Sequence, residues 1–376
     1  MANVLILGGG FGGLVAAEQL SKSIGKKHRI TLVSLNKKFT FYPALVRLAF
    51  GYCEPGDITF NLEKKLNKLN IRFVEGEVFR VDPNNKKVSV TGDDFTGNIA
   101  YDFLIVATGR RLASEKVRGF FDYSDHLLGV KGATRFGEKV KKFEKGKIVV
   151  GLSPQALLPV AAFETAFAVA RKFQKEIENR NVSVDLVLPE TVDEMFAGAK
   201  IHHELLNSFN KLGITETAPF TVAEVSKTDL ISKQGQKIPY DLLMLLPPFR
   251  GQPFLKTLKS CDEFDFVKTD AQMRVPTLEG VYAVGDIVSL PGPKLAYVAI
   301  EQAIVATANI ASEIKGEDAT AFYYHEIAAI IDAGGPESLY LHYGIWDASL
   351  YKLKKGRIWN WTKRTHDRVW QMLHKG

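Results

Sequence analysis

Cysteine and long apolar runs are scarce in this sequence, and a leader-like start is absent. Its 376 residues include two cysteines, Cys53 and Cys261, with no CxxC pair, which excludes a disulfide framework and the common zinc and dithiol motifs. No run of about 18 apolar residues occurs, so no membrane-spanning helix is predicted. The start lacks the basic and then apolar pattern of a signal peptide, which predicts an intracellular protein.

An excess of positive charge is confined to one segment. The formal net charge is +7, and residues 352–376 hold eight basic side chains against one acid, so the rest of the chain sums to zero. The 46% hydrophobic and 24% charged content is that of a globular protein with a full core. A basic groove for nucleic acid is therefore not predicted, and the basic tail needs its own explanation.

Two strand–turn–helix–strand units are predicted along the chain. In the first, the apolar segment 2–7 reads as a buried strand, a glycine turn spans 8–13, and a helix and a second strand follow up to residue 34. The second unit begins with the apolar strand 147–151, and its helix is expected at about 160–180. Both have the length of half a Rossmann domain, which predicts an α/β protein with parallel sheets.

The turn GGGFGG matches the pattern G-x-G-x-x-G with Gly8, Gly10 and Gly13. The first glycine of this pattern permits a tight turn, the second lets a pyrophosphate approach the backbone, and the third lets the helix pack on the strand. The phosphates then sit at the positive end of the helix. The pattern therefore predicts a dinucleotide site.

Polar residues at strand ends are expected to complete this site. The second strand ends in Ser34, where an acid is usual, and its hydroxyl can bind a ribose with help from Asn36. A later apolar strand, 281–284, ends in Gly285 and Asp286, which places a carboxylate beside a helix start.

The segments GGGFGG, YDFLIVATG and YAVGD, in this order, resemble the FAD oxidoreductases with two dinucleotide-binding domains. ITLVSLNKKFTFYPAL, LLPPFRGQP and PKLAY are most similar to sulfide:quinone oxidoreductases, whose relatives are the type II NADH dehydrogenases. The resemblance implies two Rossmann-like domains in a glutathione-reductase-like fold, FAD as the cofactor and a membrane quinone as the electron acceptor. The expected limits are 1–110 and 245–318 for the FAD-binding domain, 111–244 for the second Rossmann-like domain and 319–376 for a C-terminal region.

The motifs and the resemblance together define the residues expected at FAD. They lie in the glycine turn, at the strand ends and in the loops that follow. The full set is Gly8, Gly10, Gly13, Ser34, Asn36, Pro43, Val78, Ala107, Thr108, Gly109, Gly285, Asp286 and Lys294.

The resemblance also implies residues that this chain lacks. Sulfide:quinone oxidoreductases hold sulfur on cysteines near the flavin, and the matching positions here are Leu158 and Ala329. Leucine and alanine cannot hold sulfur, so the usual sulfide mechanism is expected to be absent. Cys53, after the YPAL loop, is the one candidate replacement.

The rival electron donor is NADH, which needs a second glycine turn. The second unit offers the segment 151–156, GLSPQA, where Ser153 replaces the second glycine and Pro154 lacks an N–H group. Glu190, near the end of the next strand, could bind a ribose. This turn favours a Rossmann unit that only covers the flavin, with NADH kept as the alternative donor.

Glu164 and Lys294 are the candidates for proton and charge roles. Glu164 follows the small and apolar residues of the second unit's helix, where a carboxyl should have a raised pKa and could relay protons. In the resembling family a glutamate at this position lies near the flavin and the quinone. Lys294 matches a family lysine there, where a cation would stabilise the anionic reduced flavin.

Residues 357–375 predict an amphipathic helix. At about 100° per residue its apolar side chains fall within one half-circle and its charged side chains within the other. Such a helix suits a membrane surface, with tryptophan at headgroup depth and Lys or Arg at anionic lipid, which predicts a monotopic protein at the cytoplasmic face. The expected membrane contacts are Trp359, Trp361, Lys363, Arg364, Arg368 and Trp370.

The sequence thus predicts an FAD-dependent oxidoreductase that resembles the sulfide:quinone oxidoreductase family, lacks the redox cysteines and passes electrons to a membrane quinone. One alternative is an NADH:quinone oxidoreductase. Another is a non-catalytic FAD-binding subunit that docks to a partner. The donor, the quinone type, homo-oligomerisation and covalent attachment of FAD are left open, and neither a metal site nor a nucleic-acid partner is predicted.

Overall fold

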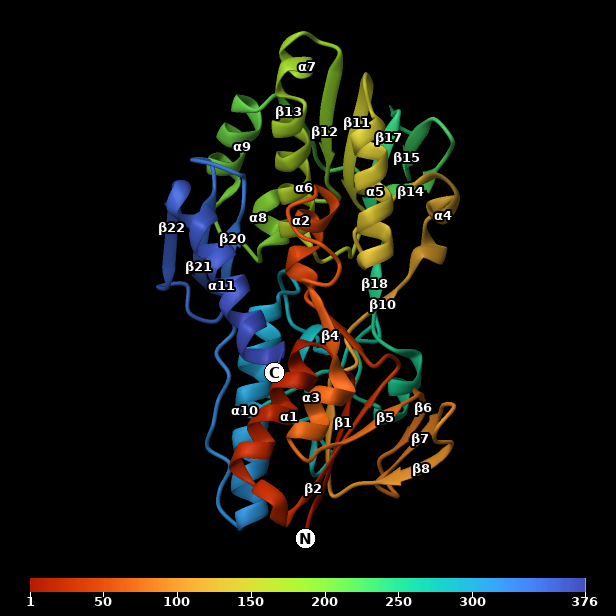
Figure 1. Cartoon of the computed structure of the whole chain (residues 1–376), viewed down its shortest axis with the longest axis vertical. Helices are drawn as coiled ribbons and strands as arrows, with labels where there is room; N and C mark the ends of the chain where they lie inside the picture. Colours follow the sequence, from red (N-terminus) through yellow and green to blue (C-terminus); the bar gives the residue numbers. More distant parts are fainter. Residues whose placement is uncertain (376) are drawn as a thin grey trace.

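Two parallel sheets form the cores of two stacked α/β units in the computed structural model, which describes residues 1–375 (Figure 1). The first sheet has the order β19-β9-β1-β2-β5, and each of these pairs is parallel. Apolar runs such as NVLIL form its strands because helices and loops cover both faces of a parallel sheet. The strands are β1 (Asn3–Leu7), β2 (Arg29–Ser34), β5 (Arg72–Glu75), β9 (Phe103–Val106) and β19 (Val281–Ala283).

The second sheet has the order β13-β12-β11-β17 and is parallel as well. Its strands are β11 (Gly146–Leu152), β12 (Val182–Val187), β13 (Ile214–Thr217) and β17 (Leu242–Leu246). The expected domain limit between residues 244 and 245 falls inside β17. β17 pairs with β11 along its whole length, from Leu242 to Leu246.

Helices flank both sheets, and α1 packs against α10 beside the first one. The helices of the two units are α1 (Phe11–Ser23), α2 (Leu45–Ala49), α3 (Leu62–Lys68), α4 (Phe120–Tyr123), α5 (Val130–Lys142), α6 (Pro159–Lys172), α7 (Gln174–Glu178), α8 (Val192–Met195), α9 (His202–Lys211) and α10 (Ala296–Lys315). Short strands add small antiparallel sheets: β3 (Lys38–Thr40) with β4 (Thr59–Asn61), β6 (Glu77–Asp82) with β7 (Lys87–Thr91) and β8 (Gly97–Ala100), β10 (Arg111–Leu112) with β18 (Phe249–Arg250), and β14 (Val222–Val225) with β15 (Asp229–Ser232) and β16 (Lys237–Pro239).

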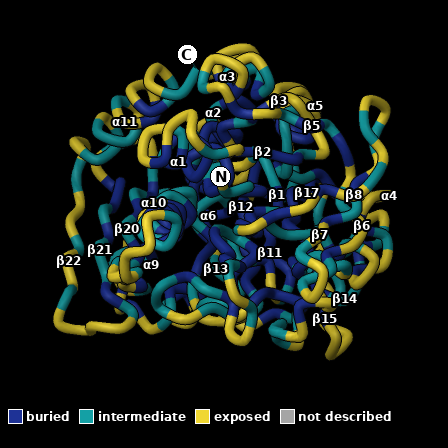
Figure 2. Tube along the Cα trace, turned by 90° about the horizontal axis from the view of Figure 1, so that it is seen from below, coloured by how far each residue is buried: buried dark blue, intermediate teal, exposed yellow. Residues whose placement is uncertain are grey.

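The C-terminal region is an antiparallel sheet followed by one helix. The sheet consists of β20 (Glu326–Ile331), β21 (Leu339–Gly344) and β22 (Tyr351–Lys355), and the helix is α11 (Arg357–Lys375). From this sheet, α11 runs back along the outside of the molecule to α1, where His374 Nδ1 lies 2.7 Å from Glu18 Oε2 (Figures 1 and 2). The helix therefore joins the C-terminal sheet to the first α/β unit.

The orientation of α11 corrects part of the sequence prediction. Trp370 was expected to face lipid, but it is buried against Phe11, Phe39 and Phe41, with ring centroids 4.8–5.5 Å apart. Lys363, also expected at lipid, points inward. The helical projection sorts side chains by hydropathy alone, and it could not show that the polar side of this helix finds charged partners inside the protein.

The remaining expected membrane contacts lie at different depths. Trp359 is half-buried and stacks on Tyr340 with ring centroids 4.5 Å apart. Trp361, Arg364 and Arg368 are exposed. Among residues 1–375, no helix is both long and apolar enough to cross a bilayer.

Candidate functional site

The glycine turn lies where the carboxyl ends of β1, β9 and β19 meet. Gly8 has φ +107°, and a Cβ atom there would lie 2.2 Å from the carbonyl oxygen of Ala107. A Cβ at Gly13 would lie 1.8 Å from the carbonyl oxygen of Gly8. By contrast, no heavy atom lies within 4 Å of the Cβ position of Gly10, which directly precedes α1. Two glycines are thus required for packing, and the third leaves the start of α1 open to a ligand.

Buried polar atoms without partners adjoin this open turn. Thr108 Oγ1 and Arg110 Nε are both buried and make no hydrogen bond in the described chain. Burying a polar atom without a partner is costly, so these atoms indicate a polar ligand. The open glycine, the N-terminus of α1 and the unpartnered atoms fit a dinucleotide such as FAD.

Asp286 pairs with a residue that the sequence analysis did not single out. Its carboxylate contacts the guanidinium of Arg110, which lies 4.4 Å from the ring centroid of Phe249. Gln302 Oε1 accepts a hydrogen bond of 2.7 Å from the N–H of Gly285. The position of Arg110 directly after the Thr108-Gly109 turn was the only sequence signal for its role.

Lys294 lies in the interior beside Asp286. It lines a small cavity with Gly285, Asp286 and His325, and Nζ donates a hydrogen bond of 2.6 Å to the carbonyl oxygen of Val288. Burial lowers the pKa of Lys294 to about 8, because a charged ammonium loses its hydration there. The side chain is therefore a buried cation at neutral pH, in the same cavity as the Gly-Asp motif.

The other expected FAD residues are spread around the turn. Ser34 ends β2, and its Oγ lies 2.9 Å from the Cβ position of Gly9. Asn36 is exposed, Pro43 is half-buried in a short helical turn, and Val78 faces Val90 in the β6–β7 ladder. Their contacts with FAD stay predictions.

The turn of the second unit is built differently. Its α6 helix begins only at Pro159, and four N–H groups of the preceding segment donate to carbonyls of the protein. The donors and acceptors are Ser153 N to Leu246 O (2.9 Å), Ala156 N to Ser153 O (3.0 Å), Leu157 N to Gln155 O (3.1 Å) and Leu158 N to Ala156 O (2.7 Å). These amides are not free to hold a pyrophosphate. Leu157 O instead accepts a 2.8 Å hydrogen bond from Lys294 N, so the turn closes onto the first unit.

Glu164 is buried at the junction of α6, β20 and α11. Its Oε1 accepts a hydrogen bond of 2.6 Å from Asp332 N and contacts the ammonium of Lys363. Burial raises the pKa of Glu164 to about 7, although Lys363 opposes that shift. The structure thus places Glu164 with the C-terminal helix, and it reveals Lys363 as a partner whose spacing of 199 residues no local motif could show.

The thiols are not poised for reaction. Cys53 is half-buried, its Sγ lies 3.9 Å from the carbonyl oxygen of Ala44, and burial raises the pKa of its thiol. Cys261 has a raised pKa for the same reason. Among the positions where the resemblance implies cysteine, Leu158 is half-buried and Ala329 is buried. A thiolate is the reactive form, so Cys53 is a poor replacement for a redox pair.

Comparisons with known proteins agree with this architecture. Residues 2–303 match the model of the pyridine nucleotide-disulphide oxidoreductase family. The chain is 26% identical to the oxidoreductase ptaL of Pestalotiopsis fici, with 86% of each chain covered. It is 23% identical to the sulfide-quinone reductase of Aquifex aeolicus, covering 83% of this chain and 77% of the relative. The crystal structure of sulfide:quinone oxidoreductase from Aquifex aeolicus superposes with a TM-score of 0.90 at 21% identity, covering 100% of this chain and 92% of that one.

Proposed function

The chain belongs to the pyridine nucleotide-disulphide oxidoreductase family and is an FAD-dependent oxidoreductase, and we propose that it reduces a membrane quinone. The similarity to a sulfide-quinone reductase supports the quinone as acceptor. FAD supplies two-electron chemistry, in which electrons are accepted from a donor and passed to the quinone.

The first unit supplies the residues that would hold FAD. The open turn at Gly10 and the N-terminus of α1 would receive the pyrophosphate. Thr108 and Arg110 would each gain a partner for a buried polar atom. Lys294 would hold a positive charge in the cavity of Gly285 and Asp286, which favours added negative charge on the cofactor.

The observation that carries the proposal is the buried pair of Glu164 and Lys363. Reduction of a quinone needs two protons, and a carboxyl with a pKa of about 7 can hold or release a proton at neutral pH. Lys363 belongs to α11, whose other side is exposed and apolar. One helix thus links a proton-holding group to a surface suited to lipid.

That surface is a stripe along the exposed side of α11. Its large apolar side chains are 43–71% exposed: Ile358, Trp361, Val369, Met372 and Leu373. Exposed arginines flank it at positions 357, 364 and 368. Apolar side chains at this density beside cationic ones suit a bilayer with anionic lipid. We therefore propose peripheral membrane binding through this stripe, without Trp370 and Lys363.

The structure favours neither of the two donors that the sequence left open. The amides of the second turn are satisfied internally, which argues against NADH. Leu158, Ala329 and the unactivated Cys53 argue against the usual sulfide chemistry. The acceptor side of the reaction is thus better supported than the donor side.

Anaerobic stopped-flow spectroscopy tests the proposed function. The purified holoenzyme is reduced photochemically, and a soluble short-chain quinone is then added. We expect the flavin absorbance to return within the mixing experiment, and Glu164→Gln to slow this return. The proposal is wrong if the quinone restores the absorbance no faster than buffer does, an outcome that would favour the non-catalytic subunit. Parallel mixing of the oxidised enzyme with NADH or sulfide identifies the donor.

Vesicle co-sedimentation tests the membrane stripe. The double variant Trp361→Ser/Leu373→Ser should lose most binding to vesicles that contain anionic lipid, because it removes two exposed apolar anchors. Phe79→Ser is the matched control, since Phe79 is 55% exposed but lies in β6. Equal binding of both variants to the vesicles would contradict the assignment of the α11 stripe as the membrane-binding surface.

A further inference from the structure

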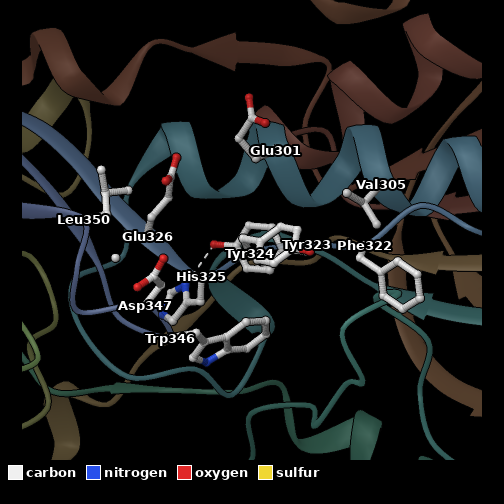
Figure 3. A pocket seen from close by; sticks show the side chains of 11 residues that line it. Glu301, Val305, Phe322, Tyr323, Tyr324, His325, Glu326, Trp346, Asp347 and Leu350 are labelled. Carbon is white, nitrogen blue, oxygen red and sulfur yellow. Dashed lines mark hydrogen bonds between the residues drawn. The ribbon is translucent and has the colours of Figure 1, made fainter.

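A second cavity lies between α10 and the C-terminal sheet, apart from the glycine turn (Figure 3). Its volume is about 390 Å³, which is within the range of small-molecule sites. Its walls come from α10, from the segment that leads into β20 and from the loop after β21. Apart from His325, which also lines the cavity of Lys294, none of these residues takes part in the proposed quinone reduction or the membrane stripe.

Aromatic rings form much of the wall. The rings of Tyr323, His325 and Trp346 contact one another, with centroids 5.7–6.0 Å apart. Phe322 and Tyr324 are 54% and 74% exposed at the rim, and Trp346 is 49% exposed. Large apolar rings gathered and exposed around a cavity are typical of a ligand site.

The charges of the lining all have one sign. Glu301, Glu326 and Asp347 contribute carboxylates, and none of them forms an ion pair with Lys or Arg within residues 1–375. Asp347 accepts hydrogen bonds from the N–H and hydroxyl of Ser349. Glu326 accepts a hydrogen bond of 2.5 Å from Tyr297 and contacts His342 Nε2 at 3.0 Å.

The remaining titratable ring of the wall, His325, does not balance these charges. Its Nε2 lies 2.8 Å from the carbonyl oxygen of Pro291 and must donate, so Nδ1 accepts from the hydroxyl of Tyr323 at 2.9 Å. Burial lowers the pKa of His325, which keeps the imidazole neutral. Figure 3 shows its ring between Asp347 and Trp346, and Glu301 and Glu326 line the same cavity from α10 and β20.

We propose that this cavity binds a small organic ammonium ion. Carboxylates without a Lys or Arg partner attract a cation, and the faces of Trp and Tyr rings stabilise an ammonium whose hydration they replace. Anions such as hydrosulfide or the pyrophosphate of NADH are disfavoured by the same charges. His325 also lines the cavity of Lys294 and Asp286, so the ammonium site shares a wall with the proposed flavin site.

Calorimetric titration of the holoenzyme tests the site. The probes are choline and phenethylammonium, each compared with a neutral isostere, 3,3-dimethylbutan-1-ol and 2-phenylethanol. We expect at least one ammonium ion to bind about tenfold more tightly than its isostere. Glu301→Gln and Trp346→Leu should each weaken binding by about 5- to 10-fold, and Trp346→Phe should restore most of it.

Glu317→Gln is the matched control, because Glu317 is an exposed acid just beyond the same helix. It should leave the affinity unchanged. The proposal is overturned if neither ammonium ion binds, or if each binds no better than its isostere. It is also overturned if Glu301→Gln and Glu317→Gln weaken binding equally, because that would indicate a general effect of charge.

Discussion

The two strand–turn–helix units of this protein share a topology but differ at their turns. In the first, α1 starts directly after Gly10, and the space beside that residue is open. In the second, a longer segment precedes α6, and its amides donate to the protein's own carbonyls. Parallel strands and a crossover helix therefore do not by themselves make a nucleotide site. An open glycine turn that leads directly into the helix start does.

The second unit contributes to the site by other means. Its turn supplies the carbonyl of Leu157 to the backbone of Lys294, and its helix supplies Glu164 to α11. The same scaffold has thus become a support for the first unit and a holder of one buried acid.

Gly10→Val should abolish FAD binding without unfolding the protein. The backbone of Gly10 is extended and no heavy atom lies within 4 Å of its Cβ position, so valine fits the ligand-free fold but fills the space for the pyrophosphate. We expect at least a 100-fold loss of FAD affinity, about 2.7 kcal/mol. Flavin content and the melting temperature of the apoprotein measure it. Gly56→Val, at another open glycine position, should retain flavin. An equal loss of flavin in both variants would contradict the assignment of the space beside Gly10 to the pyrophosphate.

Glu164→Gln should slow quinone reduction by about 100-fold, the usual cost of removing a general acid. Burial raises the pKa of Glu164 to about 7, so its carboxyl is protonated below that pH and can release a proton there. The rate of quinone reduction by the unaltered enzyme should fall as pH rises through about 7, and this decrease should be absent in the variant. Stopped-flow rates of flavin reoxidation by the quinone are measured between pH 5 and pH 9, which lie on both sides of that pKa. An unchanged pH profile would mean that Glu164 is only a structural partner of Lys363.

Sequence patterns could predict the first turn because its conformation depends on contacts between residues close together in the motif. Gly8, Gly13 and the strand before them are set by steric contacts that the spacing of the motif records. The period of α11 was predictable for the same reason, and the structure confirms the helix over Arg357–Lys375.

Long-range partners could not be predicted in this way. The side of α11 that faces the protein depends on Glu164, which contacts Lys363 from another unit. The pairing of Arg110 with Asp286 likewise spans 176 residues. Hydropathy assigned Trp370 to lipid, whereas a pocket of phenylalanines from the first unit buries it.

Lys294→Met should lower the reduction potential of the flavin, on the order of 30 mV, which equals about 1.4 kcal/mol for a two-electron couple. A cation in that cavity favours added negative charge, and the lowered pKa of about 8 means that the charge is present at pH 7 and lost as pH rises through about 8. The difference between variant and parent should therefore shrink above pH 8. Spectroelectrochemical titration measures it, with Lys268→Met as the control for an exposed lysine. Equal shifts of the flavin's reduction potential in both variants would contradict the placement of Lys294 at the flavin.

Gly151→Ala should have the smallest effect of these substitutions. It tests whether the second turn, like the first, binds a nucleotide. A Cβ at Gly151 would lie 2.9 Å from Leu245 Cδ1, the mobile end of a side chain, so we expect a loss of about 1 kcal/mol in the free energy of unfolding. Flavin content and quinone reduction should stay unchanged, because amides of the turn that follows already donate hydrogen bonds to carbonyls of the protein. If NADH reduces the flavin of the parent enzyme and Gly151→Ala raises the KM for NADH more than fivefold, then the second turn binds a nicotinamide after all, and the contrast between the two units fails.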